Sequence, residues 1–228
     1  MGKIPSDNDI TFYLCTYYDD NLLRLCLSHL REHYSSRVIV VSDGDSRLKI
    51  PEICKKYSVE FYMGKWLYGL KHGGQRHHRM LDLFFKDPSS HLIKIDTDTK
   101  VLRRFKSLPS HFCNFGSVEY RFREKFVQGG CIGYPYDVAK KLYQDKVFLG
   151  DFKTEDWNLN AMSQIAGGKI SEDQVNGYCV RQIDCPFYDH PEIKCFGTQE
   201  SRLEPKGWHE KDFAVIHPCL LWKDIKLL

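Results

Sequence analysis

Short apolar runs alternate with amphipathic stretches through the first half of the chain. The apolar runs are rich in β-branched and aromatic residues, which favour strands, and they end in polar or turn-forming residues. The pattern predicts strands at Ile10–Tyr18, Val38–Val41, Val59–Met63 and His91–Ile95.

The stretches between these runs carry apolar residues at helical spacing. Asp19-Asp20-Asn21 offers side chains that cap helix N-termini, and leucines and a cysteine follow at intervals of three and four residues. Further helices are predicted at Pro51–Tyr57 and Gln75–Phe85. Strands that alternate with helices in this way form a mostly parallel sheet with helices on both faces.

The second half of the chain is less regular, and it contains no internal repeat, low-complexity tract or clear linker. We therefore predict one domain, 1–228, with two lobes that meet near residue 100. The elements predicted after that point are strands at Gly116–Tyr120, Cys131–Tyr134 and Phe213–His217, and helices at Tyr136–Tyr143 and Asp156–Ala166.

Composition excludes several classes of protein. Of the 228 residues, 42% are hydrophobic and 28% are charged, which is typical of a globular core. Lys and Arg number 33 against 30 Asp and Glu, so the chain lacks the basic excess of a dedicated nucleic-acid binder. The longest apolar runs are far shorter than the roughly 20 residues needed to span a bilayer.

The N-terminal segment and the cysteines indicate the cellular compartment, and the C-terminal segment indicates whether further domains follow. The segment Met1–Asp7 lacks the apolar core of a secretory signal, and the nine cysteines include no Cys-x-x-Cys pair. We therefore expect reduced, mostly buried cysteines in a cytoplasmic protein. The chain ends at Ile225–Leu228 without a polar tail, which favours a domain fused to others in a longer protein.

Polar residues follow three of the predicted strands. Ligands bind at the carboxyl ends of strands in such sheets, which selects Thr16–Asp20, Ser42–Asp45 and Asp96–Asp98. The carboxylates of Asp96 and Asp98 would repel each other unless a cation lay between them. Mg2+ and Mn2+ prefer carboxylate oxygens and commonly bridge to phosphates, although an acidic turn without a ligand is the ordinary alternative.

The order of these segments resembles that of metal-dependent glycosyltransferases with the GT-A fold, which use nucleotide-sugar donors. In that family two strands hold the base and ribose, and an Asp-x-Asp after the next buried strand holds the metal and diphosphate. Later motifs are a glycine segment near the sugar, an acidic motif and a strand ending in His. The matching segments here are Thr11–Tyr18, Val38–Asp43, Leu92–Asp98, Phe126–Tyr134, Thr154–Trp157 and Ala214–Pro218.

This resemblance implies a GT-A-type, Rossmann-like α/β fold with a mixed, mostly parallel sheet flanked by helices. Residues 1 to about 100 would bind the nucleotide, and 101–228 the acceptor. The implied activity moves a hexose, with Mn2+ or Mg2+, from a nucleotide-diphosphate sugar to a hydroxyl of a glycan or glycoprotein. The resemblance favours a UDP-sugar donor and leans towards inversion of the anomeric centre.

The resemblance also assigns residues. It implies metal ligands at Asp96, Asp98 and His217, and a catalytic base at Asp156, with Glu155 as second choice. Donor-binding residues would be Thr16, Tyr18, Asp43, Lys71, Arg76, Asp96, Gly129 and Gly130.

Each assignment competes with an ordinary structural role. His217 also fits a hydrogen-bonded core residue, and Tyr18 a core aromatic. The carboxylates at 155 and 156 would stabilise the first turn of a helix. Arg76 also fits a solvated helix surface, and Asp43 also fits turn chemistry.

Two rival functions remain. Asp96 and Asp98 also fit a haloacid-dehalogenase-type phosphatase, as nucleophile and acid/base, with Gly150–Asp156 as its late acidic motif. In that class the nucleophile strand comes near the chain start, whereas several strands precede it here, so the order of motifs favours the transferase. The third candidate is a non-catalytic sugar-nucleotide-binding module.

Overall fold

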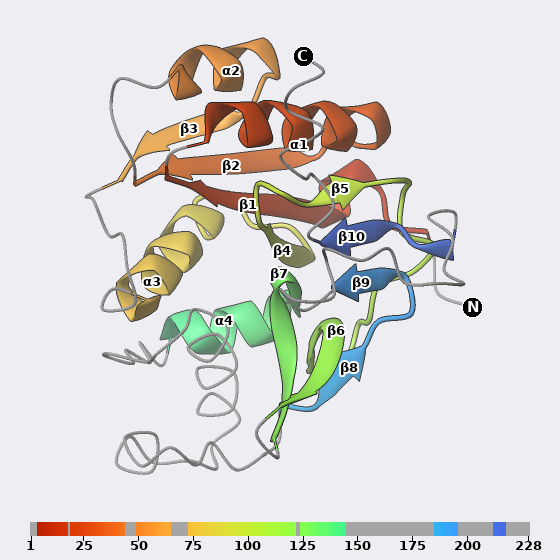
Figure 1. The fold of residues 1–228 in the computed structure, drawn as a ribbon. Coiled ribbons are helices and arrows are strands. Elements are labelled where there is room, and N and C mark those ends of the chain that lie inside the picture. The colour runs from red at the N-terminus through yellow and green to blue at the C-terminus, as the bar shows by residue number, and fades with distance from the viewer. Residues whose placement is uncertain are drawn as a thin grey trace.

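The computed structural model describes residues 4–17, 19–43, 49–64, 73–121, 124–144, 185–195 and 212–217. These segments form two β-sheets and the helices that pack against them (Figure 1). The larger sheet is the central layer of the molecule, and strands of the smaller sheet lie beside it.

The larger sheet is mixed and mostly parallel, as predicted. Its strand order is β3-β2-β1-β4-β7-β6-β8, and the first four strands run parallel. β7 is antiparallel to both β4 and β6, and β8 is parallel to β6. The strands are β1 (Ile10–Thr16), β2 (Arg37–Ser42), β3 (Glu60–Met63), β4 (His91–Ile95), β6 (Asn114–Arg121), β7 (Glu124–Pro135) and β8 (Phe187–Asp189).

The smaller sheet joins segments that are far apart in the sequence. Its order is β5-β10-β9, with β10 antiparallel to β5 and parallel to β9. Its strands are β5 (Lys100–Val101), β9 (Ile193–Cys195) and β10 (Val215–His217). The sequence pattern predicts β10, which lies in the mostly apolar run Phe213–His217. It does not predict β5, β8 or β9, which have two or three residues and do not lie in a run of that length.

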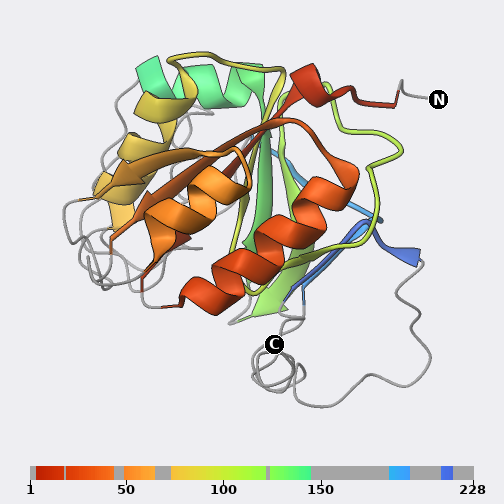
Figure 2. The same cartoon turned by 90° about the horizontal axis from the view of Figure 1, so that it is seen from above.

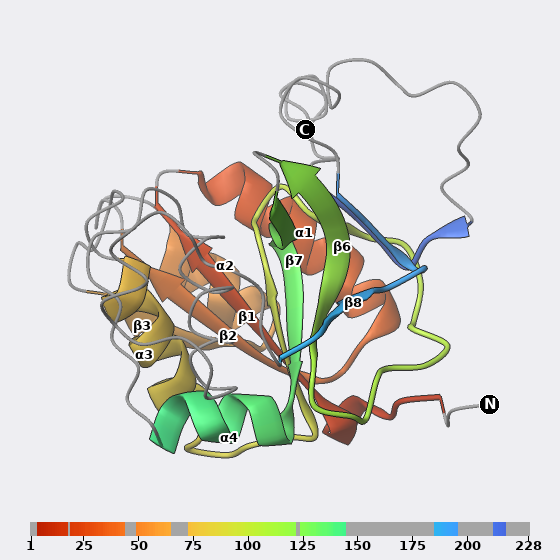
Figure 3. The same ribbon diagram turned by 90° about the horizontal axis from the view of Figure 1, so that it is seen from below.

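The helices cover both faces of the larger sheet. α1 and α2 lie on one face, and α3 and α4 lie on the other (Figures 1, 2 and 3). The bounds are α1 (Asp20–His33), α2 (Ile50–Lys56), α3 (Gly73–Phe84) and α4 (Tyr136–Gln144), with a short 3-10 helix η1 (Asp7–Asp9) before β1.

Alternation along the strands divides the core into two clusters. In β1, Phe12 and Leu14 pack under α1 and α2, whereas Tyr13 packs on the side of α3 and α4. Both faces must be apolar because helices cover both, which explains why the central strands read as continuous apolar runs. Each fully buried leucine or phenylalanine stabilises the fold by about 1.5–3 kcal/mol.

The sequence pattern locates the elements of the first half correctly. The side chain of Asp19 caps α1 by accepting a hydrogen bond from the Leu22 backbone N–H at 2.9 Å, as its position predicts. β7 extends well beyond the predicted Cys131–Tyr134, since it forms a long hairpin with β6. The helix predicted at Asp156–Ala166 lies outside the described residues.

The described cysteines are free thiols, as the composition predicts. All are buried except Cys15, which is partly buried; the others are Cys26, Cys54, Cys113, Cys131, Cys185 and Cys195. Within the described segments, no helix has both the length and the apolar character needed to cross a bilayer.

Tyr34 connects the core under α1 to the segment that follows β5. Its ring packs edge-on against Phe12 with 5.1 Å between centroids, and its hydroxyl accepts a hydrogen bond from the Phe105 backbone N–H at 2.7 Å. Burial raises the pKa of Tyr34 to about 12, so the hydroxyl is neutral at ordinary pH. This contact helps to fix β5 and, through it, the neighbouring strand β10.

We predict that Tyr34→Phe lowers the free energy of unfolding by about 1–2 kcal/mol, because the buried N–H of Phe105 loses its acceptor. Chemical denaturation measures the loss. Tyr143→Phe is the matched control: this tyrosine is 38% exposed, and its substitution should change stability by less than about 0.5 kcal/mol. Equal effects of the two substitutions would contradict the prediction.

Candidate metal and nucleotide site

Two carboxylates and one imidazole meet where the two sheets adjoin. Asp96 directly follows β4, Asp98 lies in the turn before β5, and His217 ends β10. The His217 Nε2 lies 3.0 Å from the Asp98 Oδ1 and 3.4 Å from the Asp96 Oδ2. One potential ligand atom from each residue lies within 4.8 Å of the others, so the three can bind one metal ion.

The backbone of Gly130 on β7 holds the turn that carries both aspartates. Its carbonyl oxygen accepts hydrogen bonds from the Asp96 backbone N–H at 3.1 Å and from the Thr99 hydroxyl at 3.0 Å. The Thr99 N–H closes the turn by donating to the Asp96 carbonyl at 3.1 Å. One carbonyl therefore fixes the start and the end of the Asp-x-Asp segment.

Gly130 also makes room for the imidazole of His217. A Cβ at this position would lie only 2.0 Å from the His217 Nδ1, far closer than atoms can approach. The family resemblance implies that Gly129 and Gly130 lie near the transferred sugar, and that assignment stays a prediction. The structure gives Gly130 a role that the sequence could not reveal, because the contact joins residues from opposite ends of the second half.

Lys94 is a site residue that the sequence analysis missed. Its side chain is buried, and its ammonium donates to the Asp96 Oδ1 at 2.5 Å and to the Gly129 carbonyl at 2.8 Å. A signal was present: a lysine in the middle of the apolar strand His91–Ile95 must find partners when that strand is buried.

The three potential ligands also shift one another's protonation. Burial would lower the pKa of His217, but hydrogen bonds with Asp98 and Cys195 and the charges of both aspartates raise that pKa well above its ordinary value. Burial would raise the pKa of Asp98, but contact with His217 lowers it instead. A cation held by the two carboxylates would therefore compete with the proton of the imidazole.

Cys195 lies next to His217 across the smaller sheet. The two residues are register partners in the parallel pair of β9 and β10, and the Cys195 side chain is buried. Burial raises the pKa of this thiol even though His217 acts in the other direction, so the thiol stays protonated. The ring of His217 is thus confined by Gly130 and by the strand that carries Cys195.

The predicted donor residue Asp43 has an ion-pair partner inside the protein. Its carboxylate is buried after β2, and both oxygens accept from Arg79, at 2.6 Å and 2.5 Å. Burial by itself would lower the pKa of Arg79, but Asp43 raises it, so the guanidinium stays charged. Gly64 packs so closely that a Cβ there would lie 1.7 Å from the Asp43 Oδ1.

The ordinary alternative for Arg76, a solvated helix surface, is wrong, and its assignment to donor binding stays a prediction. Its side chain is 6% exposed, and its guanidinium carbon lies 5.8 Å from the centre of the Tyr17 ring. The first half of α3 faces the carboxyl ends of β1 and β2, which is why Arg76 is buried there and Arg79 reaches Asp43. Thr16, at the end of β1, is buried, and its carbonyl accepts a hydrogen bond from the Asp43 backbone N–H at 3.0 Å.

Four of the predicted site residues lie outside the described segments. They are Tyr18, Lys71, Glu155 and Asp156. Their assignments as donor-binding or catalytic residues stay predictions.

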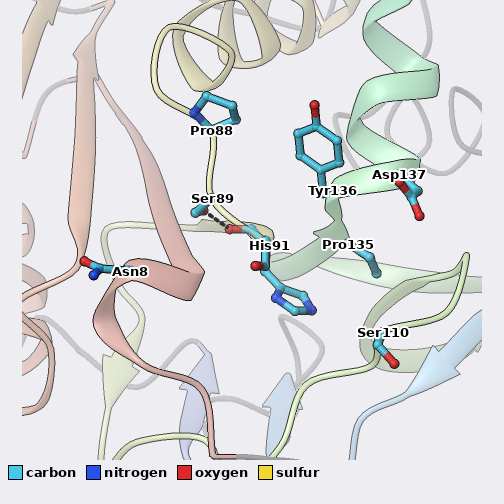
Figure 4. A pocket seen from close by; sticks show the side chains of 9 residues that line it. Asn8, Pro88, Ser89, His91, Ser110, Pro135, Tyr136 and Asp137 are labelled. Carbon is cyan, nitrogen blue, oxygen red and sulfur yellow. Dashed lines mark hydrogen bonds between the residues drawn. The ribbon is translucent and has the colours of Figure 1, made fainter.

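A separate cavity of about 440 Å³ opens at the other end of β4 (Figure 4). His91, the first residue of that strand, lines it together with Ser89 and Tyr136, whereas Asp96 follows the last residue. The Ser89 hydroxyl donates to the His91 carbonyl at 2.8 Å. This cavity lies at the opposite edge of the sheet from the carboxylates.

Comparison with known proteins identifies the fold. No family model and no curated protein sequence matches the chain. Among solved structures, a mannosyltransferase from Pyrobaculum calidifontis, PcManGT in complex with GDP-Man and Mn2+, matches 72% of the chain with a TM-score of 0.50 and 13% identity. The chain has the GT-A fold.

The GT-A likeness extends over part of the matched protein. The chain spans 55% of the length of PcManGT. The GT-A fold agrees with the prediction from the order of motifs, and it puts Asp96 and Asp98 at the carboxyl end of a central strand, where open α/β sheets bind ligands.

We predict that Gly130→Ala weakens Mn2+ binding at least tenfold, roughly the effect of losing a residue that orients a metal ligand. The added methyl group would displace the His217 ring, which lies within 2.0 Å of the new Cβ. Isothermal titration with Mn2+ measures the affinity, and a thermal melt measures the strain.

The double variant Gly130→Ala/His217→Ala separates strain from ligation. Removing the ring relieves the clash, so the melting temperature should recover relative to Gly130→Ala while Mn2+ affinity stays low. Wild-type Mn2+ affinity in Gly130→Ala would contradict the arrangement.

We further predict that Arg79→Met destabilises the protein by about 3–5 kcal/mol, because it leaves the buried carboxylate of Asp43 without its partner. Asp82→Ala, at an exposed position on the same helix, should cost less than about 0.5 kcal/mol. Urea unfolding of both variants checks the prediction, which fails if Arg79→Met stays within 1 kcal/mol of the wild type.

Proposed function

We propose that this protein is a metal-dependent glycosyltransferase that takes its sugar from a nucleoside-diphosphate sugar. The observation that carries the proposal is the meeting of Asp96, Asp98 and His217 at the carboxyl edge of a GT-A sheet. The fold alone would not be enough, because one fold hosts many functions and the chemistry lies in the site.

The three potential ligand residues suit a divalent transition metal. Two carboxylate oxygens and one imidazole nitrogen match the preferences of Mn2+, whereas Mg2+ favours oxygen ligands and bound water. Asp96, Asp98 and His217 would hold the ion through the atoms that already face one another. When bound, the ion supplies positive charge for the diphosphate that departs with the nucleoside.

The chain's own residues position these ligands. The buried ammonium of Lys94 binds the Asp96 Oδ1, so the Oδ2 is the oxygen that faces His217. Gly130 confines the imidazole and anchors the turn. Asp98 has no comparable lysine among the described contacts, and we therefore expect it to contribute more to metal binding than Asp96.

The catalytic base belongs to the same proposal. Direct displacement with inversion needs a group that takes the proton of the acceptor hydroxyl. Asp156 is the first choice and Glu155 the second, on the resemblance of Thr154–Trp157 to the acidic motif of the family. The acceptor is a hydroxyl of a glycan or glycoprotein.

The donor nucleotide has two candidates. The resemblance of the sequence motifs favours UDP, whereas PcManGT was solved with GDP-Man. Asp43, the residue proposed for base or ribose recognition, is paired with Arg79. A direct comparison of UDP-hexoses and GDP-mannose therefore belongs in the first experiment.

We predict that release of nucleoside diphosphate from the preferred donor needs Mn2+ or Mg2+, and that Asp98→Ala lowers the rate roughly 100-fold or more. The reason is that the charge on the departing diphosphate would be uncompensated. A coupled assay for UDP or GDP, with and without EDTA, measures it. Glu52→Ala, at an exposed position on α2, is the control and should keep wild-type activity.

The same assay tests the rivals. Full activity in excess EDTA would contradict the metal-dependent transferase. Release of inorganic phosphate from a phosphate ester, with no reaction of any nucleotide sugar, would favour the haloacid-dehalogenase-type alternative. Tight binding of nucleotide sugars without turnover, even with acceptors present, would favour the binding module.

A further inference from the structure

Lys94 is a buried cation inside the candidate site. It lies on the central strand β4, with Tyr13 on one neighbouring strand and Ile132 on the other, and it is 1% exposed. Burying an ammonium group costs several kcal/mol unless it is paired and hydrogen-bonded. Its pairing with the Asp96 Oδ1 and the Gly129 carbonyl provides that compensation.

The placement of Lys94 changes the charge that a metal ion would meet. Asp96 and Asp98 supply two negative charges, and the ammonium of Lys94 lies directly against one of them. A divalent ion that binds here therefore brings more positive charge than the carboxylates can balance.

A diphosphate would restore that balance. The negative charge on its oxygens would compensate for the carboxylate charge that Lys94 offsets. Divalent ions commonly bridge one or two carboxylates to substrate phosphates. Lys94 also engages one of the two oxygens of Asp96, so it limits how much of that carboxylate faces the ion.

We propose that Lys94 makes metal binding conditional on the nucleotide: the protein binds the bare divalent ion weakly and binds the ion together with a nucleoside diphosphate tightly. The inference rests on the proposed function, because it takes Asp96, Asp98 and His217 as the metal ligands. It adds a positioning and charge-balancing role for a residue that touches Asp96 and would not itself contact the reacting atoms.

The test compares two affinities. Paramagnetic resonance of free Mn2+ gives the affinity for the bare ion, and titration with Mn2+–GDP and Mn2+–UDP gives the affinity for the complex. The wild type should bind the better complex at least 100-fold more tightly than bare Mn2+. Equal affinities in the wild type would overturn the proposal without any variant.

Lys94→Gln and Lys94→Met remove the charge, and Lys94→Gln keeps a hydrogen-bond donor. Both should bind bare Mn2+ at least tenfold more tightly than the wild type, because a like charge near the ion has gone. The preference for the nucleotide complex should shrink by a similar factor. Lys94→Arg should keep the wild-type preference, since the charge is retained.

Matched controls separate the outcomes. Lys55→Gln, at an exposed position on α2, should leave both affinities unchanged, and circular dichroism shows which variants fold. Unchanged or weaker binding of bare Mn2+ in a folded neutral variant would overturn the inference. Wild-type Mn2+ binding by Asp98→Ala would instead show that the metal site, and with it the proposed function, is wrong.

Discussion

The antiparallel pairing of β4 with β7 sets the Gly130 carbonyl against the Asp96–Thr99 turn, and the rest of the candidate site depends on that contact. The same residue lacks a Cβ where the His217 ring lies. Its neighbour Gly129 accepts from Lys94. A single stretch of backbone therefore positions the two aspartates, the histidine and the lysine, and a shift of one residue in this register would separate them.

Charge balance is the second constraint on this arrangement. The carboxylates of Asp96 and Asp98, at the end of a buried strand, repel each other. Lys94 contacts the first of them and the imidazole of His217 contacts the second, and both contacts reduce the repulsion. A carboxylate in the first half of the chain has a different partner: Asp43 is paired with Arg79 through both oxygens. The buried carboxylate of Asp43 is thus held in place by a partner from another element, α3.

Much of the fold follows from the sequence pattern. β1, β2, β3 and β4 and the helices α1, α2 and α3 lie where apolar runs and helical spacing predict them, because a two-sided parallel sheet makes its strands apolar throughout. β5, β8 and β9 were not predicted, since each has three residues or fewer and, unlike β10, none lies in a longer apolar run. The pairing of Arg79 with Asp43 was not predicted, because Arg76 and Arg79 lie one helical turn apart and only the packing of α3 shows which of them reaches Asp43.

The sequence by itself determined the order of elements, the Asp-x-Asp after a central strand, and the late strand ending in His217. These are local properties, because they depend only on the type and spacing of neighbouring residues. Only the tertiary structure decided that His217 lies 3.0 Å from Asp98, that Lys94 donates to the Gly129 carbonyl, and that Gly130 makes room for the imidazole. Such contacts join β4, β7 and β10 across long stretches of chain, and no local pattern specifies which distant side chains will share the space at a sheet edge.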